Sequence, residues 1–425
     1  MDLLSFGSHG AGVELLQLGL RRYGFSSLAA DGIFGAETGA ALAGFQKKMG
    51  LRADAVYGPV TRKAMMPWFL GYTRQRIRSG DSFYSLALRF GSSMESIALA
   101  NPGADSMELR PGELLNIPFG FPVVPEDISY SSFLLGCCLR GLAVRFPFIR
   151  LGSIGRSVMG KPLWGAEIGR GDTRLIYAAG HHANEWIGTV LLLRFLEELA
   201  VAYVSKGRIF AYSAKDILDR ACISIIPCVD PDGMDLVTGY LQKGRYHSRA
   251  MAIAGGHDPT ELPRIWSANI AGTDLNLQYP AGWEKAREIK AAQGITAPAP
   301  SGYVGPAPLT APEALALYKW TLAFDPELVL AIHSQGQLIY WQFEGYAPPG
   351  AQDIAASFSA LSGYRAEAVP YSSGFAGYKD MFIQDFDRPG FTIEAGLGEN
   401  PLPISQFREI YAHCLPIFSA APLMI

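Results

Sequence analysis

Two adjacent histidines with a glutamate close behind stand out in GHHANEWIG (180–188), because the chain contains only seven histidines. The segment directly before them, RLIYAAG (174–180), is predicted to be a buried strand. Imidazole and carboxylate groups bind zinc, and they also act as general acids and bases. His181, His182 and Glu185 therefore follow a strand that can carry them to a reactive position.

Two further predicted strands end in the same way. ELVLAI (327–332) runs into His333, and GFTI (390–393) runs into Glu394. Ligand sites in open α/β sheets lie at the carboxyl ends of strands, so residues far apart in the sequence can meet there. Two histidines and a glutamate would form a three-ligand metal site with one open position, which is the catalytic form. A further carboxylate beside it would suit a general base.

Each of these residues also has an ordinary structural explanation. The histidine pair could cap a turn, His333 could be a hydrogen-bonded core histidine, and Glu394 could be a surface carboxylate. Their joint occurrence at predicted strand ends favours a site. The remaining histidines lack that context and are interpreted as structural: His9, His247, His257 and His413.

Composition narrows the class of protein. With 425 residues, 49% of them hydrophobic and 18% charged, the chain is expected to fold into two to four domains. A net charge of −3 argues against a dedicated nucleic-acid binder. No apolar run reaches the roughly 20 residues of a membrane span, and FLLGCCLRGLAV (133–144) is predicted to be a buried helix. The first residues lack the pattern of a signal peptide and the five cysteines lack metal-type spacing, so we expect a chain that is cytoplasmic as made, with buried free thiols.

The pattern along the chain predicts three parts. DGIFGAET (31–38) is repeated as DAVYGPVT (54–61) between helical segments, which predicts a small all-helical domain over residues 1–70. Residues 73–118 read as strand, helix, helix, strand, and a proline-rich linker covers 119–127. From 128 to 425, strands alternate with helices, which predicts a doubly wound α/β domain with a mixed sheet.

Taken together, GHHANEWIG, AIHSQG (331–336) and FTIEAGLGENP (391–401) resemble the zinc carboxypeptidase (carboxypeptidase A-like) family, over residues 150–420 or so. The resemblance implies one Zn²⁺ per chain, held by His182, Glu185 and His333. It also implies that Glu394 is the base that activates the attacking water, and that His181 shapes the turn. Other divalent metals would also suit these ligands.

The sequence departs from the family at two arginines. In GTDLNLQYP (272–280), Asn276 matches a substrate-binding asparagine, but Leu277 stands where an arginine binds the free C-terminal carboxylate of a peptide. A second arginine, which stabilises the oxyanion, would fall at Ser267. Candidates to replace it are Arg264, Arg245 and Arg249.

The segment YSSGFAGYKDMFIQ (371–384) resembles the family's mobile-tyrosine and pocket segment. Tyr371 matches the tyrosine that closes over the substrate. Lys379 falls at the position that lines the side-chain specificity pocket, where a cation favours an acidic group on the substrate. The alternative is a solvated surface lysine.

The first two parts of the chain indicate the substrate. Residues 1–70 resemble the peptidoglycan-binding helical domain, and 73–118 resemble a LysM module, which binds N-acetylglucosamine-containing glycans. This order of parts resembles the bacterial γ-D-glutamyl-L-diamino acid endopeptidases. The resemblance implies hydrolysis of the γ-D-glutamyl–meso-diaminopimelate bond, with peptidoglycan strands and muropeptides as partners and a location at the wall or spore.

Three alternatives remain at this stage. One is a general metallocarboxypeptidase acting on peptide C-termini, which the missing arginine disfavours. Another is a wall-binding protein whose peptidase site is weakened. The third is an amidase that releases the peptide from the sugar, for which the sequence contains no motif.

Overall fold

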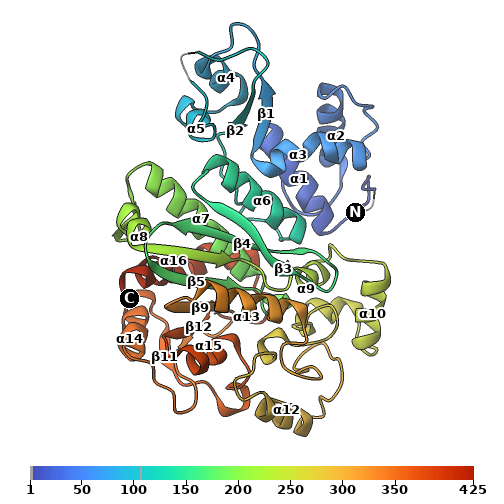
Figure 1. The fold of residues 1–425 in the computed structure, drawn as a ribbon. Helices are drawn as coiled ribbons and strands as arrows, with labels where there is room; N and C mark the ends of the chain where they lie inside the picture. The colour runs from blue at the N-terminus through green and yellow to red at the C-terminus, as the bar shows by residue number, and fades with distance from the viewer. Residues whose placement is uncertain (1–2, 106–107) are drawn as a thin grey trace. The chain divides into compact units, whose positions relative to one another are not determined.

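The computed structural model describes residues 3–105 and 108–425 (Figure 1). Residues 1–2 and 106–107, which belong to the predicted first and second parts, lie outside the described residues. The chain divides into two compact units, Met1–Ser129 with Phe133–Arg150, and Tyr130–Ser132 with Leu151–Ile425. In the part of the chain that the structure describes, no helix is long and apolar enough to cross a membrane.

The sequence repeat in the first unit is a repeat of hydrogen bonds. Three helices form this region: α1 (Ala11–Tyr23), α2 (Ala36–Lys48) and α3 (Pro59–Leu70). Gln17 of α1 donates through Nε2 to Asp31 Oδ1 (2.8 Å) and Thr38 Oγ1 (3.1 Å). Gln46 of α2 donates in the same way to Asp54 Oδ1 (3.0 Å) and Thr61 Oγ1 (3.2 Å). Each repeated Asp and Thr therefore anchors a glycine turn to a buried glutamine of the preceding helix.

The second part of this unit has the predicted strand–helix–helix–strand order. Its elements are β1 (Tyr72–Arg76), α4 (Phe83–Phe90), α5 (Met94–Leu99) and β2 (Leu114–Pro118). β1 and β2 pair antiparallel, from Tyr72 opposite Pro118 to Arg76 opposite Leu114. The core is built from buried apolar residues of α4, α5 and β2 together with Ile77, which directly follows β1: Ile77, Phe83, Leu86, Ile97, Leu115 and Ile117. The predicted buried helix is α6 (Ser132–Arg145), most of which groups with this unit.

The second unit is built on an eight-stranded mixed sheet with the order β11-β10-β12-β9-β5-β8-β4-β3. The strands are β3 (Arg150–Arg156), β4 (Pro162–Gly169), β5 (Thr173–Ala179), β8 (Ala221–Ile226), β9 (Leu328–His333), β10 (Leu338–Tyr340), β11 (Arg365–Glu367) and β12 (Gly390–Glu394). The four central strands β12, β9, β5 and β8 are parallel to one another. Antiparallel neighbours flank them, β10 beside β12 and β4 beside β8.

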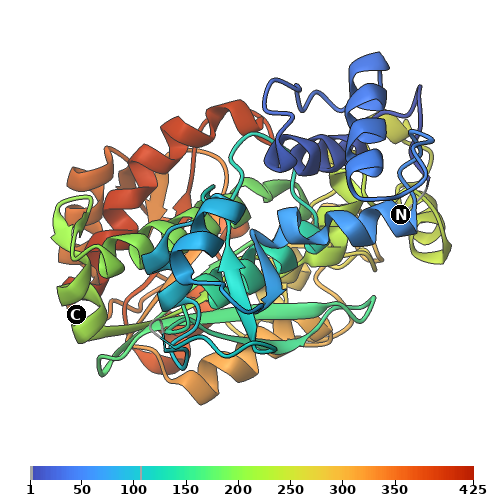
Figure 2. The same cartoon turned by 90° about the horizontal axis from the view of Figure 1, so that it is seen from above.

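Helices cover both faces of this sheet, because alternate residues of the central strands point to opposite sides. On one face, Tyr177 of β5 contacts Phe195 of α7 (Ile187–Val204) and Phe418 of α16 (Phe407–Ala420). On the other, Ile176 and Ala178 belong to a core shared with α13 (Pro312–Phe324) and α15 (Tyr378–Phe386). In Figure 2 the green and red helices α7 and α16 lie on one side of the sheet, and the orange α13 lies on the other. The doubly wound mixed sheet is confirmed.

Further helices and two short strands belong to the second unit. They are β6 (Arg208–Ile209), β7 (Tyr212–Ser213), α8 (Ala214–Arg220), α9 (Pro231–Val237), α10 (Arg245–Ile253), α11 (Leu262–Ile265), α12 (Trp283–Ala292) and α14 (Ala351–Ser362). A 3₁₀ turn, η1 (Ala183–Glu185), stands between β5 and α7. Another, η3 (Leu275–Leu277), precedes α12.

Candidate active site

The candidate residues lie at the carboxyl ends of three neighbouring parallel strands, β5, β9 and β12. β9 ends at His333 and β12 at Glu394, and the register pairs these two residues directly. β5 is the neighbour of β9 on the other side and is followed by Gly180, whose φ of 67° is accessible to glycine without strain. The chain then turns into η1, which carries Glu185.

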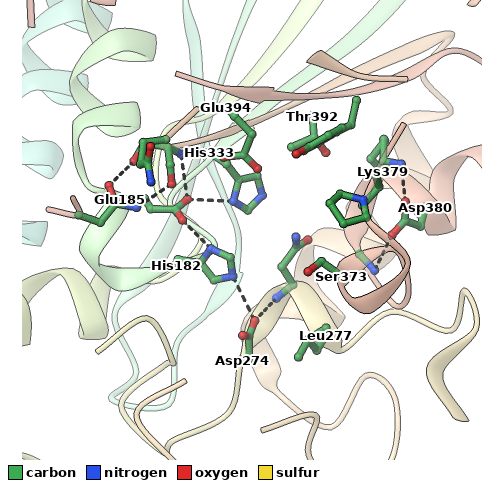
Figure 3. Close-up of a pocket in the computed structure, with 18 of the residues that line it drawn as sticks. His182, Glu185, Asp274, Leu277, His333, Ser373, Lys379, Asp380, Thr392 and Glu394 are labelled. Atoms are coloured by element: carbon green, nitrogen blue, oxygen red, sulfur yellow. Dashed lines mark hydrogen bonds and ion pairs between the residues drawn. The ribbon is translucent and has the colours of Figure 1, made fainter. Parts of the chain in front are cut away.

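The side chains of His182, Glu185 and His333 converge (Figure 3). His182 Nδ1 lies 2.8 Å from Glu185 Oε1, and His333 Nδ1 lies 2.9 Å from Glu185 Oε2. One ligand atom from each residue falls within 4.8 Å of the others. Two imidazole nitrogens and a carboxylate oxygen at this spacing are a donor set suited to zinc.

Asp274 supports this interpretation from behind His182. Its Oδ1 lies 3.2 Å from His182 Nε2, so Nδ1 remains as the ring nitrogen directed toward Glu185. Histidines that bind metal in proteins commonly donate their other ring N–H to a carboxylate, which fixes the tautomer and the ring orientation. The residues present therefore fit a metal ion.

The two carboxylates of the site differ in their electrostatic environment. Burial raises the pKa of Glu185, but the adjacent imidazoles of His182 and His333 outweigh it and lower the pKa to about 2. Burial raises the pKa of Glu394 to about 7. A carboxyl group with a pKa near neutrality is well matched to accepting and returning a proton at physiological pH.

A pocket of about 400 Å³ opens beside these residues and includes Asn276 and Lys379 in its lining. Asn276 Oδ1 accepts a hydrogen bond from the Tyr378 backbone N–H (3.0 Å). Lys379 is 3% exposed, so it is a buried residue of the pocket lining rather than a solvated surface lysine. Its Nζ donates to Gln342 O (2.7 Å) and pairs with Asp380 Oδ1 (2.5 Å), on the far side of the pocket from the histidines (Figure 3).

Tyr371 and Arg264 are not among the residues that line this pocket. Tyr371 is 65% exposed, and its ring meets that of Phe375 edge-on in a separate hollow of about 320 Å³. The Arg264 side chain is 59% exposed and lies 3.6 Å from Glu261. In this conformation neither residue joins the cluster of His182, Glu185 and His333, and their predicted roles would require movement.

Sequence reasoning missed three features of the site. Asp274 lies in a segment that resembles the family, but nothing in its spacing singles it out. Lys290 lines the pocket, yet it belongs to a helix with many exposed charges. Ser334 and Asn400 exchange side-chain and backbone hydrogen bonds of 2.8 and 2.6 Å across the site.

His181 is fully buried, with Nε2 3.1 Å from the Tyr279 hydroxyl and its ring stacked on that of His333. These contacts place His181 outside the cluster of His182, Glu185 and His333. The structure therefore groups His182, and not its neighbour, with Glu185 and His333.

Known families match all three parts of the chain. The zinc carboxypeptidase family matches residues 138–387, the peptidoglycan binding domain matches 9–65, and the LysM domain matches 76–118. Gamma-D-glutamyl-L-diamino acid endopeptidase 1 of Lysinibacillus sphaericus is 39% identical over 295 residues, 69% of this chain and 72% of that protein. The Bacillus subtilis protein YqgT is 35% identical over 268 residues, 63% of this chain and 70% of that protein.

Solved structures show the same fold at low sequence identity. Thrombin activatable fibrinolysis inhibitor aligns with a TM-score of 0.55 at 16% identity, over 83% of this chain and 98% of that one. Carboxypeptidase A from Helicoverpa armigera aligns with a TM-score of 0.53 at 17% identity, over 78% of each chain. The family match, the fold and the converging donor set agree. This chain belongs to the zinc carboxypeptidase family, as a metallopeptidase that carries a peptidoglycan-binding domain and a LysM domain.

Proposed function

We propose that this metallopeptidase hydrolyses the γ-D-glutamyl–meso-diaminopimelate bond of peptidoglycan peptides. The observation that carries the proposal is the 39% identity to an enzyme named for the γ-D-glutamyl-L-diamino acid linkage. The two wall-type domains support it, because they would hold the enzyme on the polymer that contains this bond. The proposal therefore also places the enzyme at the wall, or with the spore.

The chemistry of the substrate supports the same proposal. A γ-linked D-glutamate leaves its α-carboxylate free next to the scissile bond, and diaminopimelate carries a carboxylate at the end of its side chain. Lys379 would face that side-chain carboxylate, although Asp380 already offsets part of its charge. Leu277 replaces the arginine that would otherwise require an ordinary peptide C-terminus.

His182, Glu185 and His333 would hold the zinc ion that the family implies. Zinc bound there supplies Lewis acidity to the attacking water and to the scissile carbonyl. Ordered contacts around Glu185, from both imidazoles and from the Ser334 backbone N–H (3.2 Å), hold the ligand carboxylate in place.

Glu394 would act as the proton carrier. It takes one proton from water as the water oxygen bonds to the carbonyl carbon, and it gives that proton to the amide nitrogen as the C–N bond breaks. Its raised pKa suits both steps. Asn276 and Lys379 would orient the substrate, Tyr371 would close over it after a loop movement, and Arg264 would stabilise the oxyanion only after a comparable movement.

The test is to incubate the zinc-loaded protein with L-Ala-γ-D-Glu-meso-diaminopimelate and to follow free diaminopimelate by mass spectrometry. We expect release that a chelator abolishes and that added zinc restores. A matched peptide with an α-linked glutamate serves as the control. Release from the α-linked peptide alone would replace the proposal with a general carboxypeptidase, and no release from either would indicate a wall-binding protein with a weakened site.

A further inference from the structure

The candidate pocket contains two lysines whose electrostatic environments differ. Lys379 is buried and has an internal partner, Asp380, at 2.5 Å. Lys290 lines the same pocket and is half-buried, on helix α12. No ion pair within 4.0 Å joins Lys290 to any residue that the structure describes, so its charge is not committed to a partner within the fold.

The side chain of Lys290 packs beside Gly302. A Cβ atom at Gly302 would lie 3.7 Å from Cδ and 3.8 Å from Cε of this lysine, which is ordinary van der Waals contact, so the Lys290 side chain runs next to Gly302. The Gly302 N–H donates to Asp274 Oδ2 at 3.2 Å. Lys290 is therefore positioned on the side of the pocket that carries Asp274.

Asp274 lines the same pocket as Lys290, but its carboxylate oxygens already accept hydrogen bonds from other donors. Oδ1 accepts from His182 Nε2 (3.2 Å) and from the Asn276 backbone N–H (3.1 Å), and Oδ2 accepts from Gly302. No ion pair within 4.0 Å joins Lys290 to Asp274, whose oxygens are occupied by these other donors. The ammonium group thus retains its donors for a ligand in the pocket.

We propose that Lys290 binds a carboxylate of the substrate peptide, on the side of the pocket where Leu277 offers no charge. The inference rests on the proposed function, because it assigns the anion to the peptide named there. An ammonium is a compact point charge with three donors, so one carboxylate is a suitable partner. The peptide has three carboxylates that qualify: the α-carboxylate of D-glutamate and the two of diaminopimelate.

The test combines lysine variants with substrate amides. Lys290→Met and Lys290→Arg are made in the full chain, with Lys290→Gln as a second neutral variant in case the methionine variant folds poorly. Arg287→Met is the matched control, since Arg287 is on the same helix but pairs with Glu284 (2.6 Å) and does not line the pocket. Each protein is assayed for kcat/KM on L-Ala-γ-D-Glu-meso-diaminopimelate and on its three monoamides.

We expect Lys290→Met to lose at least tenfold in kcat/KM on the free acid, about 1.4 kcal/mol. On the one monoamide that lacks the partner carboxylate, Lys290→Met should match the wild type, which identifies the carboxylate. Lys290→Arg should keep part of the preference for the free acid over that monoamide, and Arg287→Met should keep all of it. An unchanged Lys290→Met, or an equal loss on all four peptides, would overturn the inference.

Binding separates this inference from the proposed function. Calorimetry with the same four peptides on the unsubstituted protein and on Lys290→Met requires no turnover. If the peptides bind with the expected pattern but are not cleaved, the function is wrong and the inference stands. If they are cleaved without that pattern, only the inference fails, and if none binds, both fail.

Discussion

At the scale of single residues, the site is a set of largely buried polar groups that hydrogen-bond to one another beside the pocket. Glu185 is 7% exposed, lies within 2.9 Å of two imidazole nitrogens and accepts a hydrogen bond from the Ser334 backbone N–H. Asp274 fixes one of those imidazoles from behind. Unpaired buried charges are costly, so each partner in such a network constrains the others.

Asp274→Asn should weaken metal binding about tenfold or more, because the asparagine keeps the shape but loses the charge that supports His182. Zinc affinity can be measured by competition with a chromophoric chelator. Asp172→Asn removes an exposed carboxylate of the same unit and should leave the affinity unchanged. Equal zinc affinities for the unsubstituted protein, Asp274→Asn and Asp172→Asn would show that Asp274 does not support metal binding through His182.

Glu313 should make the protein less stable as the pH rises. Burial, reinforced by Asp232, raises the pKa of its carboxyl group from 4.5 to about 7. The folded state therefore retains a proton that the unfolded chain releases, and stability falls between pH 4.5 and 7 by up to about 3 kcal/mol. Glu313→Gln should flatten this decline in urea unfolding at pH 5 and pH 8.

The exposed Glu288→Gln is the matched control for that measurement, since its side chain is 69% exposed. An unaltered decline in Glu313→Gln would assign the pH dependence to other groups.

The residues that the sequence predicts best are those at strand ends. Three apolar runs each stop at a polar residue, and the parallel arrangement brings His182, His333 and Glu394 together. Lys290 could not be found in this way, because a lysine in a charged helix such as WEKAREIKAA is ordinary. Whether it faces solvent or a pocket depends on the loop that packs beside it.

At the scale of elements, the turn that carries His182 and Glu185 rests on a neighbouring helix. α9 packs against η1, and its Gly233 lies against this turn. A Cβ atom at Gly233 would lie 2.7 Å from Cβ of Ala183 and 1.9 Å from Asp230 Oδ2. Absence of a side chain is therefore a packing requirement at this position.

Gly233→Ala should destabilise the protein by about 1–3 kcal/mol, because the added methyl group overpacks the turn beneath the site. Thermal unfolding and zinc affinity together measure the effect. Gly152→Ala is the control, since a Cβ atom there meets nothing within 4 Å. A melting temperature for Gly233→Ala equal to that of the control would show that α9 can shift to accommodate the methyl group without loss of stability.

Element types were easier to predict than their ends. The predicted strand RLIYAAG (174–180) is observed as Thr173–Ala179, and the strand that opens the predicted 73–118 part is observed as Tyr72–Arg76. Apolar periodicity marks the middle of an element, whereas its ends depend on local hydrogen bonds. The Arg78 N–H, for example, donates to the Asp81 side chain (2.8 Å) beyond the end of β1.

At the scale of the whole molecule, two glycan-directed domains share a chain with the peptidase. Their identities were readable from the sequence, because the repeated Asp and Thr residues and the strand–helix–helix–strand order are local patterns. The start of the catalytic domain at residue 128 stays a prediction. The contacts within the structure group Phe133–Arg150 with the first unit.

The full chain should sediment with purified insoluble peptidoglycan if, as we propose, its peptidoglycan-binding and LysM domains bind the wall. Glu394→Gln is used for this measurement so that the polymer stays intact. Soluble N-acetylglucosamine oligomers should reduce the bound fraction, and cellulose of the same particle size should retain little protein. Protein that remains in the supernatant with peptidoglycan would contradict the assignment of these domains to wall binding.

The most direct test of the catalytic centre is Glu394→Gln on L-Ala-γ-D-Glu-meso-diaminopimelate. The glutamine keeps the shape of the side chain but cannot carry the proton, so turnover should fall by at least the roughly 10²–10⁴-fold of general acid–base catalysis. Zinc content, measured on the same sample by atomic absorption, should stay at one ion per chain. Turnover within a few-fold of the unsubstituted protein, with zinc bound, would contradict the role of Glu394 and the mechanism built on it.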